Sequence, residues 1–247
     1  MFPPLARKRI CSTLALMFLC FGLAPGGAWA GYVVTASGTD TDGPIAAKAV
    51  FTAGNGYIQV VLYNTQSGNA SPGQSVSQFF FQVNGLSGPT GVSSVSGNTI
   101  NFATNTAGTV TNGNPADYHW GFDTHNGVYA LLDVSSGQWN GPPGQPQYMI
   151  IGPNAAAGPL QNSFNPFFNS WATFIVTDPG ITVNTALNAS DITNVQFGFG
   201  TGPETVLNGS QSPVVPAPPS IVLCAIGGIG FAGFLIVRSR RRQLAAA

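Results

Sequence analysis

Short apolar segments separated by turn residues fill the chain between residues 31 and 212. The clearest pair, residues 47–53 and 57–64, flanks the triplet Gly54-Asn55-Gly56. Runs rich in β-branched and aromatic residues that end at such turns predict strands, and an Asn-Gly pair supplies the positive φ angles of a type I′ turn. The sequence therefore predicts a β-hairpin here. No segment between the ends carries a long helical period.

The same pattern predicts more strands along the chain. They cover residues 32–36, 77–83, 92–95, 98–104, 128–134, 148–151, 172–177 and 194–199, with 92–95 and 98–104 paired as a second hairpin. Short strands at near-regular spacing are typical of a sandwich or barrel. We therefore expect an all-β fold, a β-sandwich of the jelly-roll or immunoglobulin-like type, over residues 31–212. Residues 138–170, rich in Pro, Gly and Asn, are expected to form a long surface excursion.

Charge is distributed very unevenly along the chain. Of the eight Lys and Arg residues only Lys48 lies between residues 31 and 212, whereas all eight Asp and Glu residues lie there. One cation against eight acids gives this region a net charge of −7. A basic patch for nucleic acid is therefore excluded. Because Cys11, Cys20 and Cys224 all lie outside the region, it also lacks a disulfide, a thiol nucleophile and a cysteine metal site.

The N-terminus has the three parts of a secretory signal peptide. Arg7-Lys8-Arg9 precedes an apolar stretch over residues 10–24, and Ala28 and Ala30 form a small-residue cleavage site. Cleavage after Ala30 is expected, which makes residues 1–30 the signal peptide. A retained N-terminal anchor is the alternative.

The C-terminus contains a segment of membrane length. Residues 221–237 form an uncharged run of 17 residues, which spans about 25 Å as a helix. The cations that follow it predict a cytoplasmic tail at residues 238–247 and an exported body. These topology-setting cations are Arg238, Arg240, Arg241 and Arg242.

The C-terminal segments together resemble a bacterial sorting signal. Val215-Pro216-Ala217-Pro218 lies in a Pro-rich linker at residues 213–220, ahead of the apolar run and the arginines. This arrangement resembles the PEP-CTERM family, although Ala217 stands where that signal has glutamate. The resemblance implies processing by an exosortase-like transpeptidase. A single-pass anchor that is never cut is the alternative.

The region between the ends also looks like the variable exported domains that precede such tails. Three segments carry this likeness: residues 49–65, residues 165–182 and residues 195–201. The resemblance implies an extracellular role without established catalysis. The partners it implies are the Sec translocon, signal peptidase, the transpeptidase and extracellular polysaccharide, with the membrane contacted through the C-terminal helix before processing. We expect a single-pass inner-membrane precursor that reaches the cell surface or the extracellular matrix.

One polar and aromatic cluster, residues 117–127, contains both histidines. Because alternate residues of a strand share a face, His119, Asp123 and His125 could converge on a transition metal. The alternative is a loop whose side chains bond to the local backbone, so no cofactor is assigned.

Exposed aromatic residues offer a different kind of site. Tyr118, Trp120 and Trp139 could stack on sugars, whereas Trp171 lies in a strand pattern for which core packing is the ordinary explanation.

No catalytic template is present. A hydrolase needs a nucleophile with a base or paired carboxylates, and the sequence contains no Gly-x-Ser-x-Gly motif. We therefore assign no catalytic residue and expect a structural or adhesive protein rather than an enzyme. A carbohydrate-binding module is the first alternative, and a metal-dependent enzyme is the second.

Overall fold

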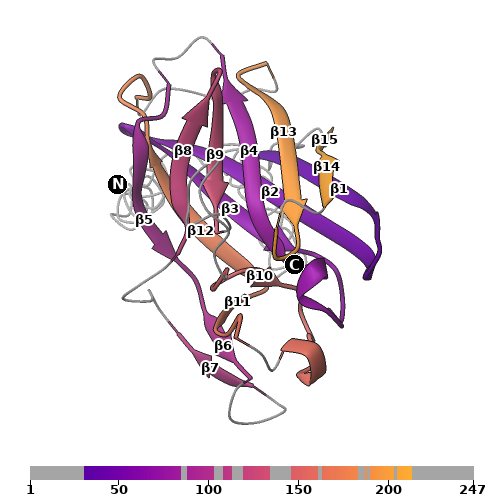
Figure 1. The fold of residues 1–247 in the computed structure, drawn as a ribbon. Coiled ribbons are helices and arrows are strands. Elements are labelled where there is room, and N and C mark those ends of the chain that lie inside the picture. The colour runs from indigo at the N-terminus through magenta and orange to yellow at the C-terminus, as the bar shows by residue number, and fades with distance from the viewer. Residues whose placement is uncertain are drawn as a thin grey trace, which may run out of the picture. The chain divides into compact units, whose positions relative to one another are not determined.

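β-Strands make up nearly all of the regular structure of this protein (Figure 1). The computed structural model describes residues 31–84, 88–102, 108–112, 119–133, 146–160, 163–182, 187, 190–202 and 205–212. They belong to a unit that spans Ala30–Val214. Within these ranges no helix is long and apolar enough to cross a membrane. The predicted signal peptide, linker, transmembrane segment and tail lie outside the described residues.

The elements follow one another in short runs. They are β1 Tyr32–Asp40, β2 Gly43–Gly54, β3 Tyr57–Asn64, η1 Pro72–Gln74, β4 Val76–Val83, β5 Gly91–Ser96, β6 Thr99–Asn101, β7 Thr109–Thr111, β8 Gly121–His125, β9 Val128–Leu132, β10 Ile150–Ile151, η3 Gly158–Leu160, β11 Phe167–Asn169, β12 Trp171–Thr177, β13 Ile192–Phe199, β14 Thr205–Asn208 and β15 Ser210–Ser212. The two η elements are short 3-10 helices. The all-β prediction is confirmed for the described residues.

One layer is a six-stranded antiparallel sheet in the order β15-β1-β2-β3-β12-β5. Strands β1, β2 and β3 form a meander. Strand β12 pairs with β3 although more than a hundred residues separate them. Along β3 and β12, fully buried residues alternate strictly with half-buried ones. One face of this sheet therefore contacts the core, and the other is turned away from it.

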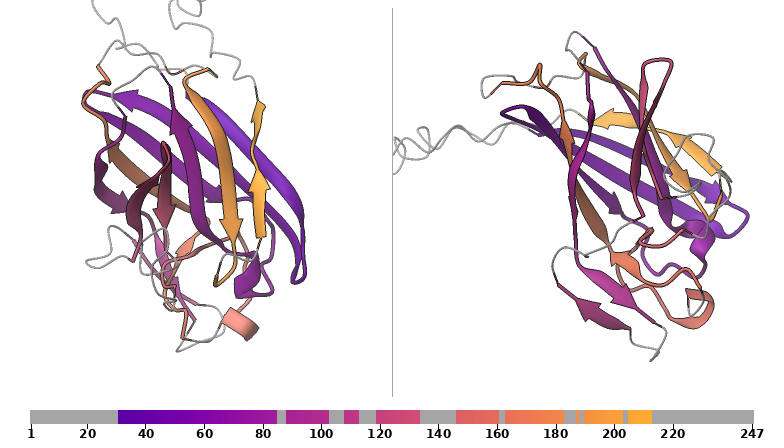
Figure 2. Two further views of the ribbon diagram at one scale, coloured as in Figure 1. Left: turned by 45° about the horizontal axis from the view of Figure 1, so that its top comes forward. Right: turned by 60° about the vertical axis from the view of Figure 1, so that its left-hand side comes forward.

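The other layer is a nine-stranded sheet that branches at β4. Strand β4 pairs with β13 on one side, and β13 carries β14. On its other side β4 pairs with β9 over Gln78–Phe81 and with β10 at Val76. Strand β9 also pairs with β8. Strand β10 pairs with β11, β11 with β6 and β6 with β7, and this part of the sheet lies at one end of the two packed sheets (Figure 2).

Aromatic side chains join the two sheets. Phe51 of the six-stranded sheet lies 5.6 Å from Phe81 and 5.8 Å from Phe79 of the nine-stranded sheet, measured between ring centroids. All three side chains are fully buried. Burial of such rings is the dominant stabilising contribution in a domain that has no cysteine.

A second, smaller core overturns the expected surface excursion at residues 138–170. Met149, Ile151, Leu160 and Phe167 are fully buried and pack with residues of β6. The turn residues of this segment explain why it has no long strands. Its apolar residues are nevertheless buried, because they pack against one another and against β6. Residues 134–145 and 161–162 lie outside the described residues.

The second predicted hairpin is wrong. Residues 92–95 belong to β5 in the six-stranded sheet, whereas residues 99–101 form β6 in the nine-stranded sheet. Val95 pairs with Phe174 of β12, and Ile100 pairs with Phe167 of β11. The chain changes layer at Gly97, because each apolar strand is satisfied by a partner that is distant in sequence.

The first hairpin is confirmed, but its turn differs from the prediction. Gly54 pairs with Tyr57, and only Gly56 has a positive φ, of 79°. The loop that follows β12 holds this turn, since the Gly56 amide donates to Ile181 O and the Asp178 amide donates to Gly56 O, both over 2.9 Å. Two positive φ angles, as a type I′ turn requires, occur instead at Asn126-Gly127 between β8 and β9.

Candidate functional site

The aromatic positions predicted to bind a ligand include one core residue. Trp120 is 3% exposed, its ring lies 4.9 Å from that of Phe174, and its Nε1 donates to Tyr148 O over 2.9 Å. It cannot stack on a sugar from the surface, so that assignment is corrected. Trp120 lies immediately before β8, and it is buried because it belongs to the main core cluster, where it packs on Phe174. Tyr118 and Trp139 lie outside the described residues.

The predicted metal trio does not form a metal site. His119 is exposed and lies edge-on to Tyr148 at 6.1 Å, whereas Asp123 Oδ1 accepts a bond from the Thr124 amide at 2.7 Å. His125 is exposed at the end of β8. In the described ranges, no three His, Cys, Asp or Glu side chains are grouped so as to hold a metal. The prediction extended strand alternation back to His119, but β8 begins at Gly121.

Trp171 takes the exposed role that the sequence favoured for Trp120. It is half-buried on the outer face of the six-stranded sheet, and the next residue, Ala172, is fully buried on the opposite face. Trp171 pairs directly with Tyr63, and Tyr63 pairs directly with Lys48. The Lys48 Nζ lies 4.1 Å from the centre of the Tyr63 ring, a cation–π contact. We call Lys48, Tyr63 and Trp171 the aromatic row.

Neutral residues surround the aromatic row on the outer face of β1, β2, β3 and β12. They are all half-buried and comprise Val33, Thr35, Val50, Thr52, Gln59, Val61, Thr173 and Ile175. Flat apolar surface, hydroxyl groups and aromatic rings are combined here without a carboxylate. Such a surface can stack against a sugar ring and hydrogen-bond to its hydroxyl groups.

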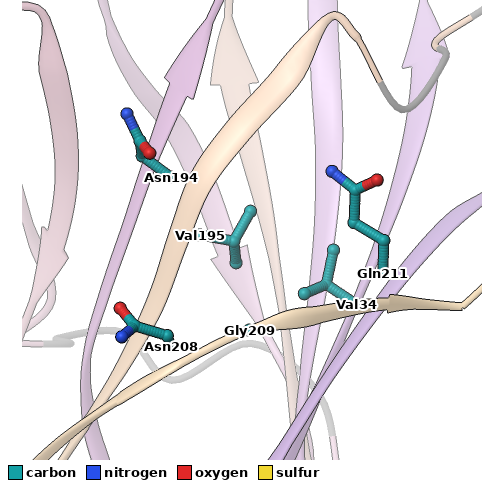
Figure 3. A pocket seen from close by; sticks show the side chains of 6 residues that line it. All are labelled: Val34, Asn194, Val195, Asn208, Gly209 and Gln211. Atoms are coloured by element: carbon teal, nitrogen blue, oxygen red, sulfur yellow. The ribbon is translucent and has the colours of Figure 1, made fainter.

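A pocket of about 210 Å³ opens where the edges of the two sheets meet (Figure 3). Asn194 and Asn208 lie on one side of it and Gln211 on the other, with Val34 and Val195 between them. Gly209, where the chain passes from β14 to β15, completes the lining. Among the described residues that line the pocket, none carries a charge or a nucleophile, so the pocket is suited to holding a neutral ligand.

Two of the pocket carboxamides are held by neighbouring amides. Gln196 Nε2 donates to Asn208 Oδ1 over 2.9 Å, and Asn194 Nδ2 donates to Gln82 Oε1. Each bond uses one polar atom of the pocket residue. Asn194 therefore keeps its oxygen acceptor, and Asn208 keeps its nitrogen donor, for other groups.

Two carboxyl groups are buried in the part of the chain that the structure describes, those of Asp133 and Asp178. Asp178 Oδ1 accepts a hydrogen bond from the Gly180 amide over 2.9 Å. Asp133 is 2% exposed, and its backbone amide donates to Ser77 O over 2.9 Å. Burial raises the pKa of the Asp133 carboxyl well above its usual value, and the nearby Gln147 amide opposes the shift only in part. Neither carboxyl oxygen, nor the Ser77 hydroxyl, completes a hydrogen bond of good geometry. This group is too enclosed to meet a substrate.

The residues of the aromatic row and the pocket were not identified from the sequence as a site. Nothing in the spacing of Lys48, Tyr63 and Trp171 groups them, because their proximity depends on the pairing of β3 with β12. No protein-family model matches this chain, and no curated protein or solved structure is similar to it. Function is therefore inferred from the residues themselves.

Proposed function

We propose that this chain is the precursor of an exported bacterial surface or matrix protein with an adhesive role. The two packed sheets are interpreted as a β-sandwich ectodomain of the jelly-roll or immunoglobulin-like type. A signal peptide at residues 1–30 and a PEP-CTERM-like tail after Val215 deliver it. The distribution of cations supports this, since Lys48 is the single Lys or Arg between residues 31 and 212.

The observation that carries the adhesive role is the aromatic row. Tyr63 and Trp171 are opposite each other on the outward face, and that face is neutral apart from Lys48. Aromatic rings on a regular sheet are held rigidly, so stacking on a sugar loses little conformational entropy. A body with net charge −7 repels polyanions, which favours a neutral polysaccharide as the partner.

Affinity electrophoresis of the full chain in gels containing amylose, mannan or hydroxyethyl cellulose tests this role. Trp171→Ala and Tyr63→Ala are each expected to weaken retardation by the preferred polysaccharide about 10-fold, which corresponds to about 1.4 kcal/mol. Tyr57→Ala is the matched control, because Tyr57 lies on the same face and strand but outside the aromatic row. Equal retardation of all variants, or no retardation by any polysaccharide, contradicts the role.

Delivery is tested separately by the intact mass of the protein recovered from its native cell envelope. Removal of the signal peptide after Ala30 gives Gly31 as the first residue. A C-terminus between residues 216 and 220 supports exosortase-like processing. A C-terminus at Ala247 contradicts processing and leaves a single-pass membrane anchor.

A further inference from the structure

The pocket in Figure 3 is built by two unusual backbone features. The register of β13 against β4 shifts between Thr193 and Gln196, and Asn194 within this bulge has a φ of 49°. Such left-handed non-glycine residues are uncommon and occur often at binding sites. Within the bulge, Asn194 lies on one side of the pocket, and Val195 lies between the polar residues, where it forms the apolar floor together with Val34.

The second feature is the close crossing of the chain at Gly209. Its amide donates to Val195 O over 2.8 Å. A Cβ atom on Gly209 would lie 2.4 Å from Val34 Cγ1 and 3.1 Å from Val195 O. Glycine therefore allows the strand crossing to lie against the two valines of the floor.

The chemistry of the lining defines the ligand. Asn194 presents an acceptor and Asn208 a donor, and a sugar hydroxyl group can both donate and accept. The valines form an apolar floor for the C–H face of a ring. None of the lining residues that the structure describes is charged, which disfavours ions. A volume of about 210 Å³ is below the range of drug-sized sites and fits a single ring rather than a chain.

We propose that this pocket binds one neutral sugar unit through Asn194 and Asn208. It is a second site, independent of the aromatic row, because none of its lining residues belongs to that row. Its described lining includes no aromatic ring, so the expected Kd for a monosaccharide is about millimolar. Two weak sites on one domain raise the overall affinity for a repeating polymer through effective concentration.

Nuclear magnetic resonance of the full, isotope-labelled chain in detergent micelles tests the proposal. Methyl glucoside, methyl mannoside and N-acetylglucosamine are titrated separately, and the side-chain amide signals of Asn194 and Asn208 are followed. At least one sugar is expected to shift both signals with saturation. Glucuronate is expected to bind more weakly, since the described lining residues offer no cation to its carboxylate.

Matched variants separate this site from the aromatic row. Asn194→Gly keeps a residue that tolerates the left-handed backbone but removes the carboxamide, and it is expected to weaken binding at least 10-fold by the Asn208 signal. Trp171→Ala is expected to leave the monosaccharide Kd unchanged while it impairs polysaccharide retardation. The wild-type titration needs no variant, so a misfolded variant does not obscure the result.

Two results overturn the proposal. One is the absence of any saturable shift at Asn194 and Asn208 with the neutral sugars up to 100-fold above the expected Kd, about 0.1 M. The other is an equal or stronger shift with a neutral blocked peptide, N-acetyl-alanine methylamide, which would assign the pocket to peptide backbone. Neither result affects the aromatic row, whose own test is the gel retardation of Trp171→Ala.

Discussion

The indole nitrogen of Trp120 donates a hydrogen bond to the backbone carbonyl of Tyr148 over 2.9 Å, and Tyr148 has a φ of 66°. A core side chain thus bonds to a backbone segment in an uncommon conformation between β9 and β10. The same indole packs on Phe174 of the opposite sheet. Trp120 therefore links the two layers to the start of the smaller core.

Replacement of Trp120 is expected to destabilise the fold strongly. Trp120→Ala should lower the free energy of unfolding by about 3–5 kcal/mol, because it leaves a large cavity and removes the hydrogen bond to the Tyr148 carbonyl. Trp171→Ala, a change of the same size on the outer face, should cost less than half as much. Urea denaturation followed by circular dichroism measures both. Similar losses for the two variants would contradict the assignment of Trp120 to the core and Trp171 to the surface.

Asp133 should make stability depend on pH. Its pKa is raised in the folded state above the unfolded value near 3.8, so its contribution is fully present below pH 3.8 and is lost as pH rises through the raised pKa. Asp133→Asn is expected to remove this loss and to exceed the wild type in stability at the alkaline end. Free energies of unfolding from pH 4 to pH 9 measure the effect.

Ser77→Ala is the matched control for Asp133. It removes the buried hydroxyl of the residue whose backbone is bonded to Asp133 but keeps the titrating group, so the pH dependence should persist. If the stability of the wild type does not fall relative to that of Asp133→Asn as the pH rises, the raised pKa of Asp133 is refuted.

Asn64 should be intolerant of an isosteric change. It is 2% exposed, and its Nδ2 donates to Gln74 O at 2.8 Å and to Ile150 O at 3.0 Å. Asn64→Asp keeps the shape but removes both donors and turns a carboxyl towards two carbonyl groups. A loss of about 2–6 kcal/mol is expected, at 1–3 kcal/mol for each unpaired group.

Thermal and urea denaturation measure the loss at Asn64, with Gln66→Ala as the control. Gln66 is half-buried next to the same turn, and its side chain bonds only locally, to Ser67 O at 3.2 Å. Its replacement should change stability by less than about 0.5 kcal/mol. Equal stabilities of Asn64→Asp and the control would exclude a structural role for the Asn64 amide.

Gly209 should not accept a side chain. Gly209→Ala is expected to cost about 1–3 kcal/mol, because its Cβ would overlap Val34 and press on Val195 O. Gly91→Ala is the control, since a Cβ at Gly91 meets nothing within 4 Å. The shift in the midpoint of thermal unfolding checks the pair, and an unaffected Gly209→Ala would show that the strand crossing can move away.

Local sequence patterns predicted where the strands lie better than which strands pair with each other. The hairpin of β2 and β3, the strand at residues 77–83 and the strand at residues 172–177 were recognised because β-branched and aromatic runs between turn residues have few other solutions. The hairpin expected at residues 92–104 failed because adjacency in sequence does not oblige two strands to pair. Val95 pairs instead with Phe174 and Ile100 with Phe167, and both residues are buried there.

The two described tryptophans show the same limit at the level of function. Trp120 lies in loop-like sequence yet is buried, and Trp171 lies in a strand yet faces outward. Sequence context alone could not distinguish them, because a strand has two faces and only the packing of the second sheet decides which one is covered. The aromatic row and the pocket between β13, β14 and β15 were not predicted for the same reason.

The sequence by itself determined that the region between the ends would be a cysteine-free, acidic, all-β fold, since composition and short-range periodicity depend on neighbouring residues. It also predicted export and sorting from both ends, and that prediction awaits its experiment. Only the tertiary structure decided which strands pair, which aromatic residues face outward and which three carboxamide residues line one pocket. Those outcomes depend on contacts between residues far apart in the chain, which are selected by the burial they jointly achieve.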